Sequence, residues 1–191
     1  MDLSRRALDV APELLGCVLR VRGVGVRLTE VEAYEGADDP ASHAWKGMTA
    51  RNASMFERGG RIYVYTMHGH ACLNIVCGPA GVASAALVRA GEVVEGIEEA
   101  RLRRPGVRDA WLARGPGNLC RALGVTRADD GTAFGTSGLD LAGTSVDPDA
   151  VRVGVRVNVS RAFDRPWRFW LDSPSVSAAK LHPNARNYTE P

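Results

Sequence analysis

The sequence predicts an α+β fold, in which a mostly antiparallel or mixed, curved sheet is flanked by helices within a single domain. Two observations lead to this prediction. The strand candidates cluster along the chain, and the helix candidates lie at the ends and in the middle instead of alternating with strands. A length of 191 residues suits one domain with a sizeable core. A content of 45% hydrophobic and 24% charged residues is ordinary for a soluble globular protein.

The chain is expected to begin with helix and then turn to strand. Residues 4–16, SRRALDVAPELLG, predict one or two short helical pieces, with Ser4 as the N-cap and Pro12 starting the second piece. Residues 17–34 predict a β-hairpin that turns near Gly23–Gly25.

The middle of the chain combines loops, helices and strands. Residues 36–48 predict a loop, and residues 49–60 predict a short helix that is capped by Thr49 and closed by two glycines. Residues 92–104 predict a clear helix, because their acidic residues come early and their arginines late, as the helix dipole favours. Residues 115–124 open another helix after a flexible turn. Strands are predicted at 61–67, 71–77 and 82–90.

The C-terminal part returns to strand after a long connection. Residues 125–150 are rich in Gly and Asp turns and predict loops. Residues 151–160 and 165–171 predict strands. The tail from about residue 182 to 191 is expected to be frayed.

The cysteines and the N-terminus indicate a cytoplasmic protein. The four cysteines have no CxxC spacing, which predicts reduced and mostly buried thiols. The residues after Met1 are too charged for a secretory leader, and no apolar run reaches membrane-spanning length. We therefore expect no membrane association.

The sequence predicts neither a metal site nor a cofactor. His68 and His70 form an HGH pair, but no third ligand has suitable spacing. The chain has no P-loop, no GxGxxG after a strand and no GxSxG. Nucleotide hydrolysis, Rossmann chemistry and α/β-hydrolase chemistry are therefore disfavoured.

The basic residues are almost all arginine. The net charge of +2 does not by itself indicate a polyanionic partner, but of 24 basic residues only Lys46 and Lys180 are lysine, which leaves 22 arginines. Arginine suits phosphate recognition, and a GC-rich genome would produce the same bias. Composition alone leaves both interpretations open.

Two glutamates lie within a strand candidate, in the stretch LTEVEAYEG. Strict alternation places Leu28, Glu30, Glu32 and Tyr34 on one face. Such glutamates usually face solvent, and the apolar character of the opposite face supports that interpretation. The alternative is a pocket, because a carboxylate shielded by an aromatic ring has a raised pKa and can act as a base near neutral pH.

Other segments carry the same ambiguity. Tyr63 and Tyr65 share a strand face and are either half-buried strand residues or a stacking wall for a flat ligand, and His43 in a polar loop is equally ambiguous. Residues 114–124, RGPGNLCRALG, either hold a phosphate on exposed backbone N–H groups or form an ordinary loop before a helix.

Nine segments, running in order from about residue 11 to 177, carry a resemblance to a known family. They are LLGCVL, TEVEAYEG with DPASHAWKG, TARNASMF, IYVY, CLNIVC, LVRAGEVVEGIEEAR, RGPGNLCRALG, RVGV, and RPWRFWL with SPSVS. In this order they resemble the alkyladenine (3-methyladenine) DNA glycosylase family, of the mammalian, monofunctional type. The resemblance covers most of the chain.

The resemblance implies a DNA base-excision repair enzyme. Such an enzyme flips out an alkylated or deaminated purine and hydrolyses the N-glycosidic bond, which leaves an abasic site. Glu32 matches the general base that activates water, and Arg89 and the backbone carbonyl of Val153 match groups that hold this water. Glu30 does not match the general base of the family, so we expect it to have a supporting or electrostatic role. No lysine lies in these motifs to form a Schiff base, which supports hydrolysis without strand cleavage.

The resemblance also implies a pocket for the flipped base. Tyr34 matches one wall, and His43 and Tyr65 match the other. Asn74 matches the residue that excludes normal guanine by crowding its exocyclic amine. A cationic alkylated purine would gain cation–π attraction from these rings.

One segment departs from the family pattern. The family has a tyrosine shortly after YVY that wedges into the duplex, and the segment YVYTMHGHACLN is one residue shorter here. Counting forward from Tyr65 gives His68 as the wedge, and counting back from Asn74 gives Met67. Either side chain could hold a base step open.

The expected partner is double-stranded DNA that contains damaged purines, bound by a monomer. We expect it to be cytoplasmic and nucleoid-associated, and the lack of a long N-terminal extension suggests a bacterial protein. Two alternatives remain: a DNA-damage-binding protein that lost catalysis, and an N-glycoside hydrolase of free nucleosides.

The candidate contacts to the DNA backbone are Arg51, Gly115, Gly117 and Asn118.

Overall fold

Antiparallel strands dominate the computed structural model, which describes residues 1–143, 146–178 and 183–184. Within this part the strands form a nine-stranded sheet in the order β3-β4-β5-β2-β1-β7, with β6 beside β5 and the pair β8–β9 joined to β2. Every pair of strands in the described part is antiparallel, so the predicted α+β class is confirmed. The strands are β1 (Val18–Val21), β2 (Val24–Tyr34), β3 (Ile62–Met67), β4 (His70–Val76), β5 (Ala85–Glu95), β6 (Ala113–Arg114), β7 (Leu139–Ala142), β8 (Arg152–Gly154) and β9 (Arg168–Trp170).

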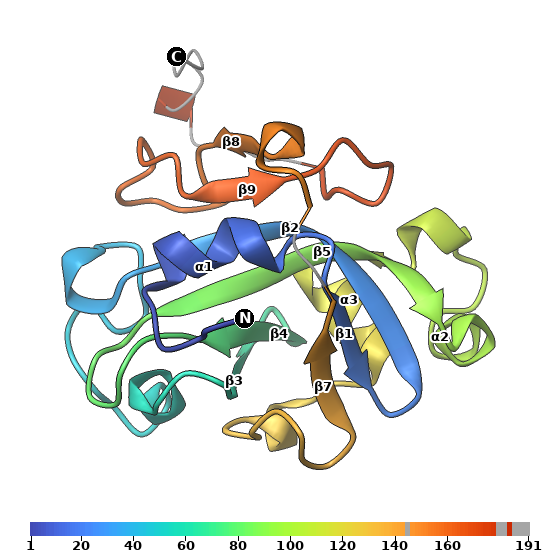
Figure 1. Cartoon of the computed structure of the whole chain (residues 1–191), viewed down its shortest axis with the longest axis horizontal. Coiled ribbons are helices and arrows are strands. Elements are labelled where there is room, and N and C mark those ends of the chain that lie inside the picture. Colours follow the sequence, from blue (N-terminus) through green and yellow to red (C-terminus); the bar gives the residue numbers. More distant parts are fainter. Residues whose placement is uncertain (144–145, 179–182, 185–191) are drawn as a thin grey trace.

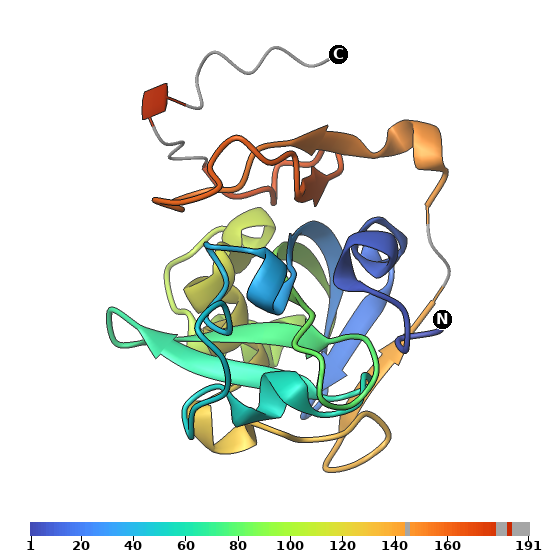
Figure 2. The same ribbon diagram turned by 90° about the vertical axis from the view of Figure 1, so that its left-hand side faces the viewer.

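Three α-helices in the described residues pack on this sheet, joined by short 3₁₀ turns. Helices α1 and α3 contribute buried residues to the same apolar core as the strands. The segment that carries β8 and β9 forms a separate layer over the rest of the molecule (Figures 1 and 2). The helices are α1 (Ala7–Leu14), α2 (Ile97–Arg103) and α3 (Pro116–Leu123), and the 3₁₀ turns are η1 (Gly36–Asp38), η2 (Ala53–Phe56), η3 (Asp109–Trp111), η4 (Arg127–Asp129) and η5 (Pro148–Ala150).

The first helix is one continuous piece. It begins after Arg6, which is extended, so the prediction of Ser4 as N-cap was wrong; the Ser4 hydroxyl donates to Asp2 instead. Pro12 lies inside the helix and does not start a second one. A proline there forfeits one backbone hydrogen bond, but the buried apolar face of the helix still holds the turn against the core.

The β1–β2 hairpin turns at Arg22 and Gly23, and the predicted hairpin is confirmed. Both residues have positive φ, 48° and 82°, as in a type I′ turn whose twist matches that of the strands. Gly25 already belongs to β2, where it pairs with Arg20.

Helix α2 is shorter than the sequence predicts, because β5 continues to Glu95. Glu92 pairs with Arg27 of β2, so these residues belong to the sheet and not to a helix. Gly96 ends the strand at φ 66°, and a Cβ at this position would lie 2.2 Å from the carbonyl oxygen of Gly23. Glycine is therefore required where β5 gives way to α2.

Two other segments depart from prediction. Within residues 49–60 only a 3₁₀ turn, η2, forms, and Thr49 does not cap it; its backbone N–H and its hydroxyl donate to Oδ1 of Asn52. Within residues 151–160 only β8 is strand, and further on the backbone N–H of Val157 donates to the Glu32 carboxylate instead of to a neighbouring strand. The predicted loop at 125–150 includes β7.

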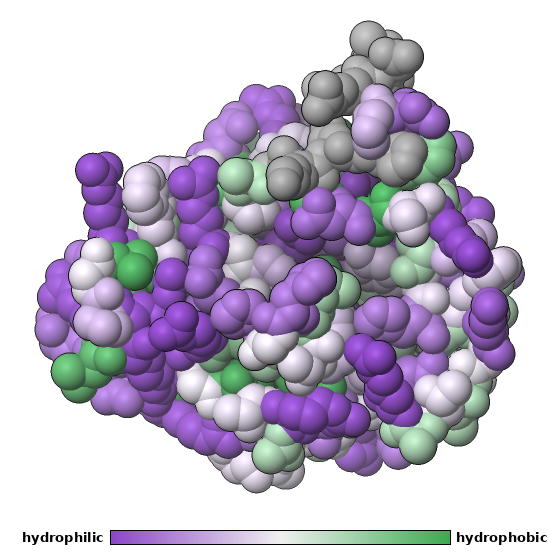
Figure 3. Space-filling model, turned by 180° about the vertical axis from the view of Figure 1, so that it is seen from behind, coloured by the Kyte–Doolittle hydropathy of each residue, from purple (hydrophilic) through white to green (hydrophobic). Residues whose placement is uncertain are grey.

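The expected fraying from residue 182 concerns residues that, apart from 183–184, lie outside the described part of the chain. No helix in the described part is long and apolar enough to cross a membrane. The four cysteines are buried and free, as predicted. Seen from behind, the surface is mainly hydrophilic, and its hydrophobic residues lie in small separate groups (Figure 3).

Candidate active site

A bulge in β2 turns the two glutamates away from the apolar core. Leu28 pairs with Gly91, whereas Glu30 pairs with Ala90, so Thr29 is an extra residue in the strand. The core-facing residues are therefore Val24, Val26 and Leu28 before the bulge, and Val31 and Ala33 after it. Strict alternation from the sequence wrongly placed Leu28 on the glutamate face.

The facing strand β5 has its own irregularity at Arg89. Ala90 pairs with Glu30 and Val88 pairs with Val31, so Arg89 is the extra residue on this side. Bulges re-aim side chains next to functional sites. Here the bulge directs the buried guanidinium of Arg89 toward both glutamates.

Glu30 and Glu32 are fully buried, so the interpretation that they face solvent was wrong. Oε1 of Glu32 accepts a hydrogen bond from the backbone N–H of Val157 at 2.7 Å. Its Oε2 accepts from the hydroxyl of Tyr34 at 2.9 Å and from Nη1 of Arg89 at 3.3 Å. Both oxygens of this carboxylate are thus oriented by fixed donors.

Glu30 is the main partner of Arg89. Its Oε1 accepts from Nε of Arg89 and from Nε of Arg168, both at 2.8 Å, and its Oε2 accepts from the backbone N–H of Ser177 at 2.7 Å. Burial opposes ionisation of Glu30, but Arg89 and Arg168 outweigh it and lower the pKa of this carboxyl. The glutamates also outweigh burial at Arg89 and raise its pKa. Two carboxylates and two guanidiniums therefore balance in charge beneath the pocket.

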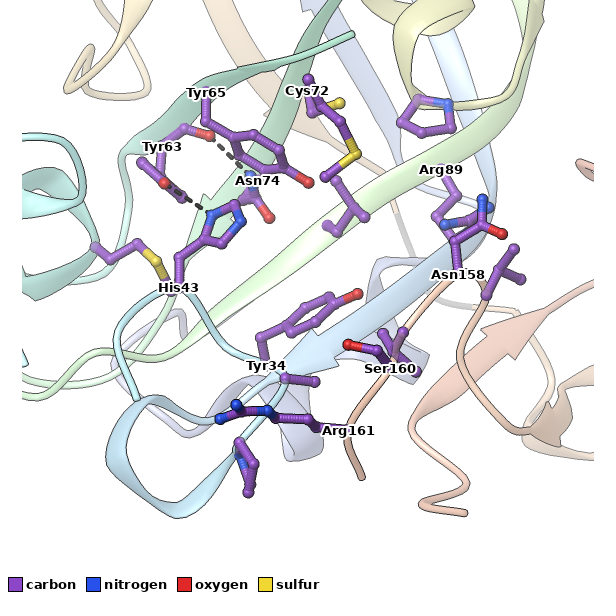
Figure 4. A pocket seen from close by; sticks show the side chains of 18 residues that line it. Tyr34, His43, Tyr63, Tyr65, Cys72, Asn74, Arg89, Asn158, Ser160 and Arg161 are labelled. Carbon is purple, nitrogen blue, oxygen red and sulfur yellow. Dashed lines mark hydrogen bonds between the residues drawn. The ribbon is translucent and has the colours of Figure 1, made fainter. Parts of the chain in front are cut away.

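Tyr34 and Arg89, which contact Glu32, line a pocket of about 360 Å³ (Figure 4). Its walls come from the loop at residues 40–43, strands β2 to β5, Pro116 at the start of α3, and residues 157–161. Tyr34 lies across the open space from His43 and Tyr65 (Figure 4). A volume of this size and such walls suit a small flat ligand.

The aromatic wall is a connected unit. The rings of His43 and Tyr65 lie 4.4 Å apart at 82°, and Nδ1 of His43 hydrogen-bonds the hydroxyl of Tyr63 at 3.1 Å. The backbone carbonyl of His43 accepts from Nδ2 of Asn52 at 2.9 Å. Partial burial, together with Arg51, lowers the pKa of His43 below 6.5, so its ring is neutral at pH 7. Tyr63 and Tyr65 are buried strand residues, and both also line the pocket. The two interpretations of these tyrosines, as strand residues and as a wall for a flat ligand, are therefore compatible.

Tyr34 is supported from behind by a buried ion pair. The guanidinium of Arg156 lies 4.6 Å from the Tyr34 ring centroid, and its nitrogens donate to both oxygens of Asp39, at 2.5 and 2.8 Å. Arg156 and Asp39 are both fully buried. Burial and the neighbouring Glu32 raise the pKa of Tyr34, so its hydroxyl remains a donor.

Asn74 and Met67 also line the pocket. Asn74 is buried, and its Nδ2 donates to the backbone carbonyl of Tyr63 at 3.1 Å. Met67 ends β3 on the same strand face as Tyr63 and Tyr65 and is 44% exposed. His68 lies in the hairpin turn at φ 49° and does not line the pocket. This hairpin projects from the body of the molecule at the left of Figure 2.

Val153 lies apart from the other predicted catalytic residues. It belongs to β8, pairs with Phe169, is 40% exposed and does not line the pocket. Val157, four residues further on, makes the contact to Glu32.

The predicted backbone-contact residues do not line the pocket, but they lie close to residues that do, near Pro116 and the end of β3. Arg51 is exposed and donates to the carbonyl of Thr66 at 3.3 Å. Gly115 has φ 97° and precedes α3, and Nδ2 of Asn118 donates to the carbonyl of Arg114. A Cβ on Gly117 would lie 2.8 Å from Cβ of His70, so α3 begins tightly against the β3–β4 hairpin.

Several site residues were missed from the sequence. Their roles depend on contacts between segments more than 80 positions apart, which no local pattern encodes. The segment VRVNVSR would have invited attention only through its alternation of polar and apolar residues. The missed residues are Arg156, Val157, Asn158, Ser160, Arg161, Arg168 and Ser177. Within the described residues, His, Cys, Asp and Glu form no group of three that could hold a metal ion.

An aromatic-walled pocket, two of whose lining residues hold an oriented, buried carboxylate, is the arrangement of a hydrolase-type site. The model of the methylpurine-DNA glycosylase family matches residues 1–175, and the chain belongs to this family of DNA glycosylases. The predicted resemblance and the predicted class of enzyme are thereby confirmed.

Curated relatives agree with this membership. A protein of Streptomyces avermitilis is 51% identical, with 97% of this chain and 93% of that protein covered. Proteins of Cutibacterium acnes and Nocardia farcinica are 45% and 50% identical, covering 94% and 92% of this chain and 99% and 88% of their own lengths. Each of the three is named "Putative 3-methyladenine DNA glycosylase".

Proposed function

We propose that this protein removes alkylated purines from DNA by hydrolysis of the N-glycosidic bond, with a water activated by Glu32. The names of its relatives support the DNA-repair activity and 3-methyladenine as a substrate. One observation carries the mechanism: the buried Glu32 carboxylate is oriented by Val157, Tyr34 and Arg89, and these three residues line an aromatic pocket.

The pocket suits a flipped, cationic base. Tyr34 and the His43–Tyr65 pair would face the two sides of a purine, and aromatic rings attract cations over their faces. His43 is neutral at pH 7, so it adds no repulsion toward a positively charged alkylpurine. The proposal also covers deaminated purines, which fit the same walls but lack the cationic attraction. Asn74 is proposed to limit which ring edges fit, because its buried side chain is fixed by Tyr63.

In the reaction, the water oxygen forms a bond to C1′ while the bond from C1′ to the purine nitrogen breaks. The bonding electrons leave with the purine, and the proton of the water passes to Glu32. The transition state carries positive charge on the sugar, as in other glycoside hydrolyses, and the Glu32 carboxylate stabilises it. Arg89 holds Glu32 from below, and Glu30 together with Arg168 fixes Arg89. Val157, and not Val153, supplies the backbone contact to Glu32, so this mechanism assigns Val153 no part.

We propose Met67 as the residue that fills the space of the extruded nucleotide. It is exposed at the pocket rim, whereas His68 lies in the turn beyond it. An apolar side chain between base steps can hold an extruded conformation. The partner is double-stranded DNA, bound by a monomer in the bacterial cytoplasm. Among the described residues no lysine lines the pocket, which favours release of the base without strand cleavage.

The test is base release from duplex oligonucleotides that each carry one lesion: 3-methyladenine, 7-methylguanine, hypoxanthine or an ethenoadenine. We expect release from at least the 3-methyladenine duplex and none from undamaged DNA. Binding of these duplexes without any release would favour the damage-binding alternative. Turnover of free methylated nucleosides at a comparable rate would favour a nucleoside hydrolase.

A further inference from the structure

A second hollow, of about 370 Å³, lies between the end of α2 and the start of α3. Its polar lining consists of Arg104, Arg108, Arg114 and Asn118, and Trp111 forms its apolar side. The guanidinium of Arg108 lies 5.0 Å from the Trp111 ring centroid, and that of Arg114 lies 5.5 Å from it. The exposed indole is therefore in cation–π contact with two guanidiniums.

The arginines of this hollow differ from their neighbours in lacking acidic partners. On α2, Arg101 pairs with Asp109 at 2.7 Å and Arg103 pairs with Glu99 at 3.0 Å. In the described part of the chain, Arg104, Arg108 and Arg114 form no ion pair with a carboxylate. The positive charge of the hollow is therefore uncompensated, at the surface of a protein whose net charge is only +2.

The backbone fixes two of these guanidiniums and leaves the third available. Nη1 of Arg104 donates to the carbonyls of Trp111 and Leu112, and Nε of Arg114 donates to the carbonyl of Val176. Arg108 is exposed, and its contact is with the indole face. The remaining guanidinium N–H groups are donors of the kind that binds phosphate oxygens in pairs.

A short turn separates this hollow from the base pocket. Pro116 lines the base pocket, whereas Arg114 and Asn118, two residues away on either side, line the hollow. Two residues of extended chain span at most about 7 Å, and a DNA strand carries one phosphate per about 3.4 Å of helix axis. A strand whose nucleotide enters the pocket therefore passes the hollow within a few phosphates.

We infer that this hollow is a binding site for a backbone phosphate of the DNA strand, a few nucleotides from the extruded one. The inference rests on the proposed function, because it takes DNA as the substrate. The hollow is expected to bind a phosphate group. Such a group belongs either to the DNA backbone or to a free phosphate compound, and the test distinguishes these two ligands.

The test is the salt dependence of DNA binding by Arg108→Ala, followed by fluorescence anisotropy of a labelled duplex over a series of KCl concentrations. We expect severalfold weaker binding and a slope of log Kd against log[KCl] that is lower by about 0.9, the loss of one phosphate contact. Arg101→Ala is the matched control, because it removes the same charge from a paired arginine of the neighbouring helix. The control should keep the wild-type slope.

Equal slopes for Arg108→Ala and wild type would overturn the inference. So would a thermal stabilisation by inorganic phosphate that Arg108→Ala loses while its DNA slope stays unchanged, since that result assigns the site to a free phosphate. Base release by the wild type is measured separately. If the wild type releases the base but the salt slopes of wild type and Arg108→Ala are equal, only the phosphate site is rejected. If the salt slopes differ but the wild type releases no base, only the proposed function is rejected.

Discussion

The backbone N–H of Val157 donates a 2.7 Å hydrogen bond to Oε1 of Glu32, across 125 positions of the sequence. This bond joins the C-terminal layer to the central strand of the sheet. It fixes the carboxylate without a second ionisable group, so Glu32 can take up a proton without breaking an ion pair at this oxygen. The orientation of the Glu32 carboxylate therefore depends on the path of residues 156–160, which follow β8 in the chain and are not strand residues.

Replacing Glu30 by Gln should destabilise the protein strongly. Arg89 and Arg168 would lose their shared carboxylate while both remain buried, and breaking such a pair costs about 3–5 kcal/mol. The free energy of unfolding in urea measures this change. A loss below about 1 kcal/mol, the size typical of an exposed pair, would show that the cluster does not depend on Glu30.

The same carboxyl should make stability depend on pH in the acid range. Its folded-state pKa lies below the ordinary value of 4.5, so its contribution is fully present above pH 4.5 and is lost as the pH falls through the folded pKa. Urea unfolding between pH 6 and pH 3 should show wild type losing more stability than Glu30→Gln. Parallel pH curves for the two proteins would contradict this.

His43 should make the choice of lesion depend on pH. Its pKa is lowered from 6.5, so the ring becomes cationic only below that value and then repels a cationic base. We expect kcat/KM for a 7-methylguanine duplex to fall more steeply below pH 6.5 than kcat/KM for a hypoxanthine duplex. His43→Phe keeps a flat ring and should remove the difference between the two profiles.

Met67→Ala should impair nucleotide extrusion. Extrusion costs a few kcal/mol, so removal of the residue that holds the gap should slow base release by about tenfold or more. His68→Asn is the matched control, because asparagine tolerates the positive φ of this turn. Equal single-turnover rates for Met67→Ala and wild type, with a slower His68→Asn, would reverse the assignment.

Local patterns predicted most strands and all three α-helices of the described part. The alternation of apolar and polar residues, together with the turn residues between segments, predicted the β1–β2 hairpin, β3, β4 and most of β5. The errors have physical causes. Pairing with β2 kept Glu92–Glu95 in the sheet despite a good helix pattern, and the buried face of α1 kept Pro12 inside a helix.

The site was predicted only in part. The resemblance supplied Glu32, Arg89, Tyr34, His43, Tyr65 and Asn74, and the structure brings these six together. The bulges at Thr29 and Arg89 could not be predicted, because they depend on the register between strands about 60 residues apart. Val157 was missed for a similar reason: its backbone, not its side chain, reaches Glu32.

The central claim is that Glu32 activates the water, and single-turnover base release by Glu32→Gln tests it most directly. Gln keeps the shape, and its single oxygen can accept from Val157 while its amide group donates to the Tyr34 hydroxyl, but it cannot accept a proton from water. The measurement uses a duplex with one 3-methyladenine and follows binding by anisotropy in parallel. The account predicts near-normal binding with release slowed by at least about a hundredfold, the usual contribution of a general base. Release within a few-fold of wild type would contradict it.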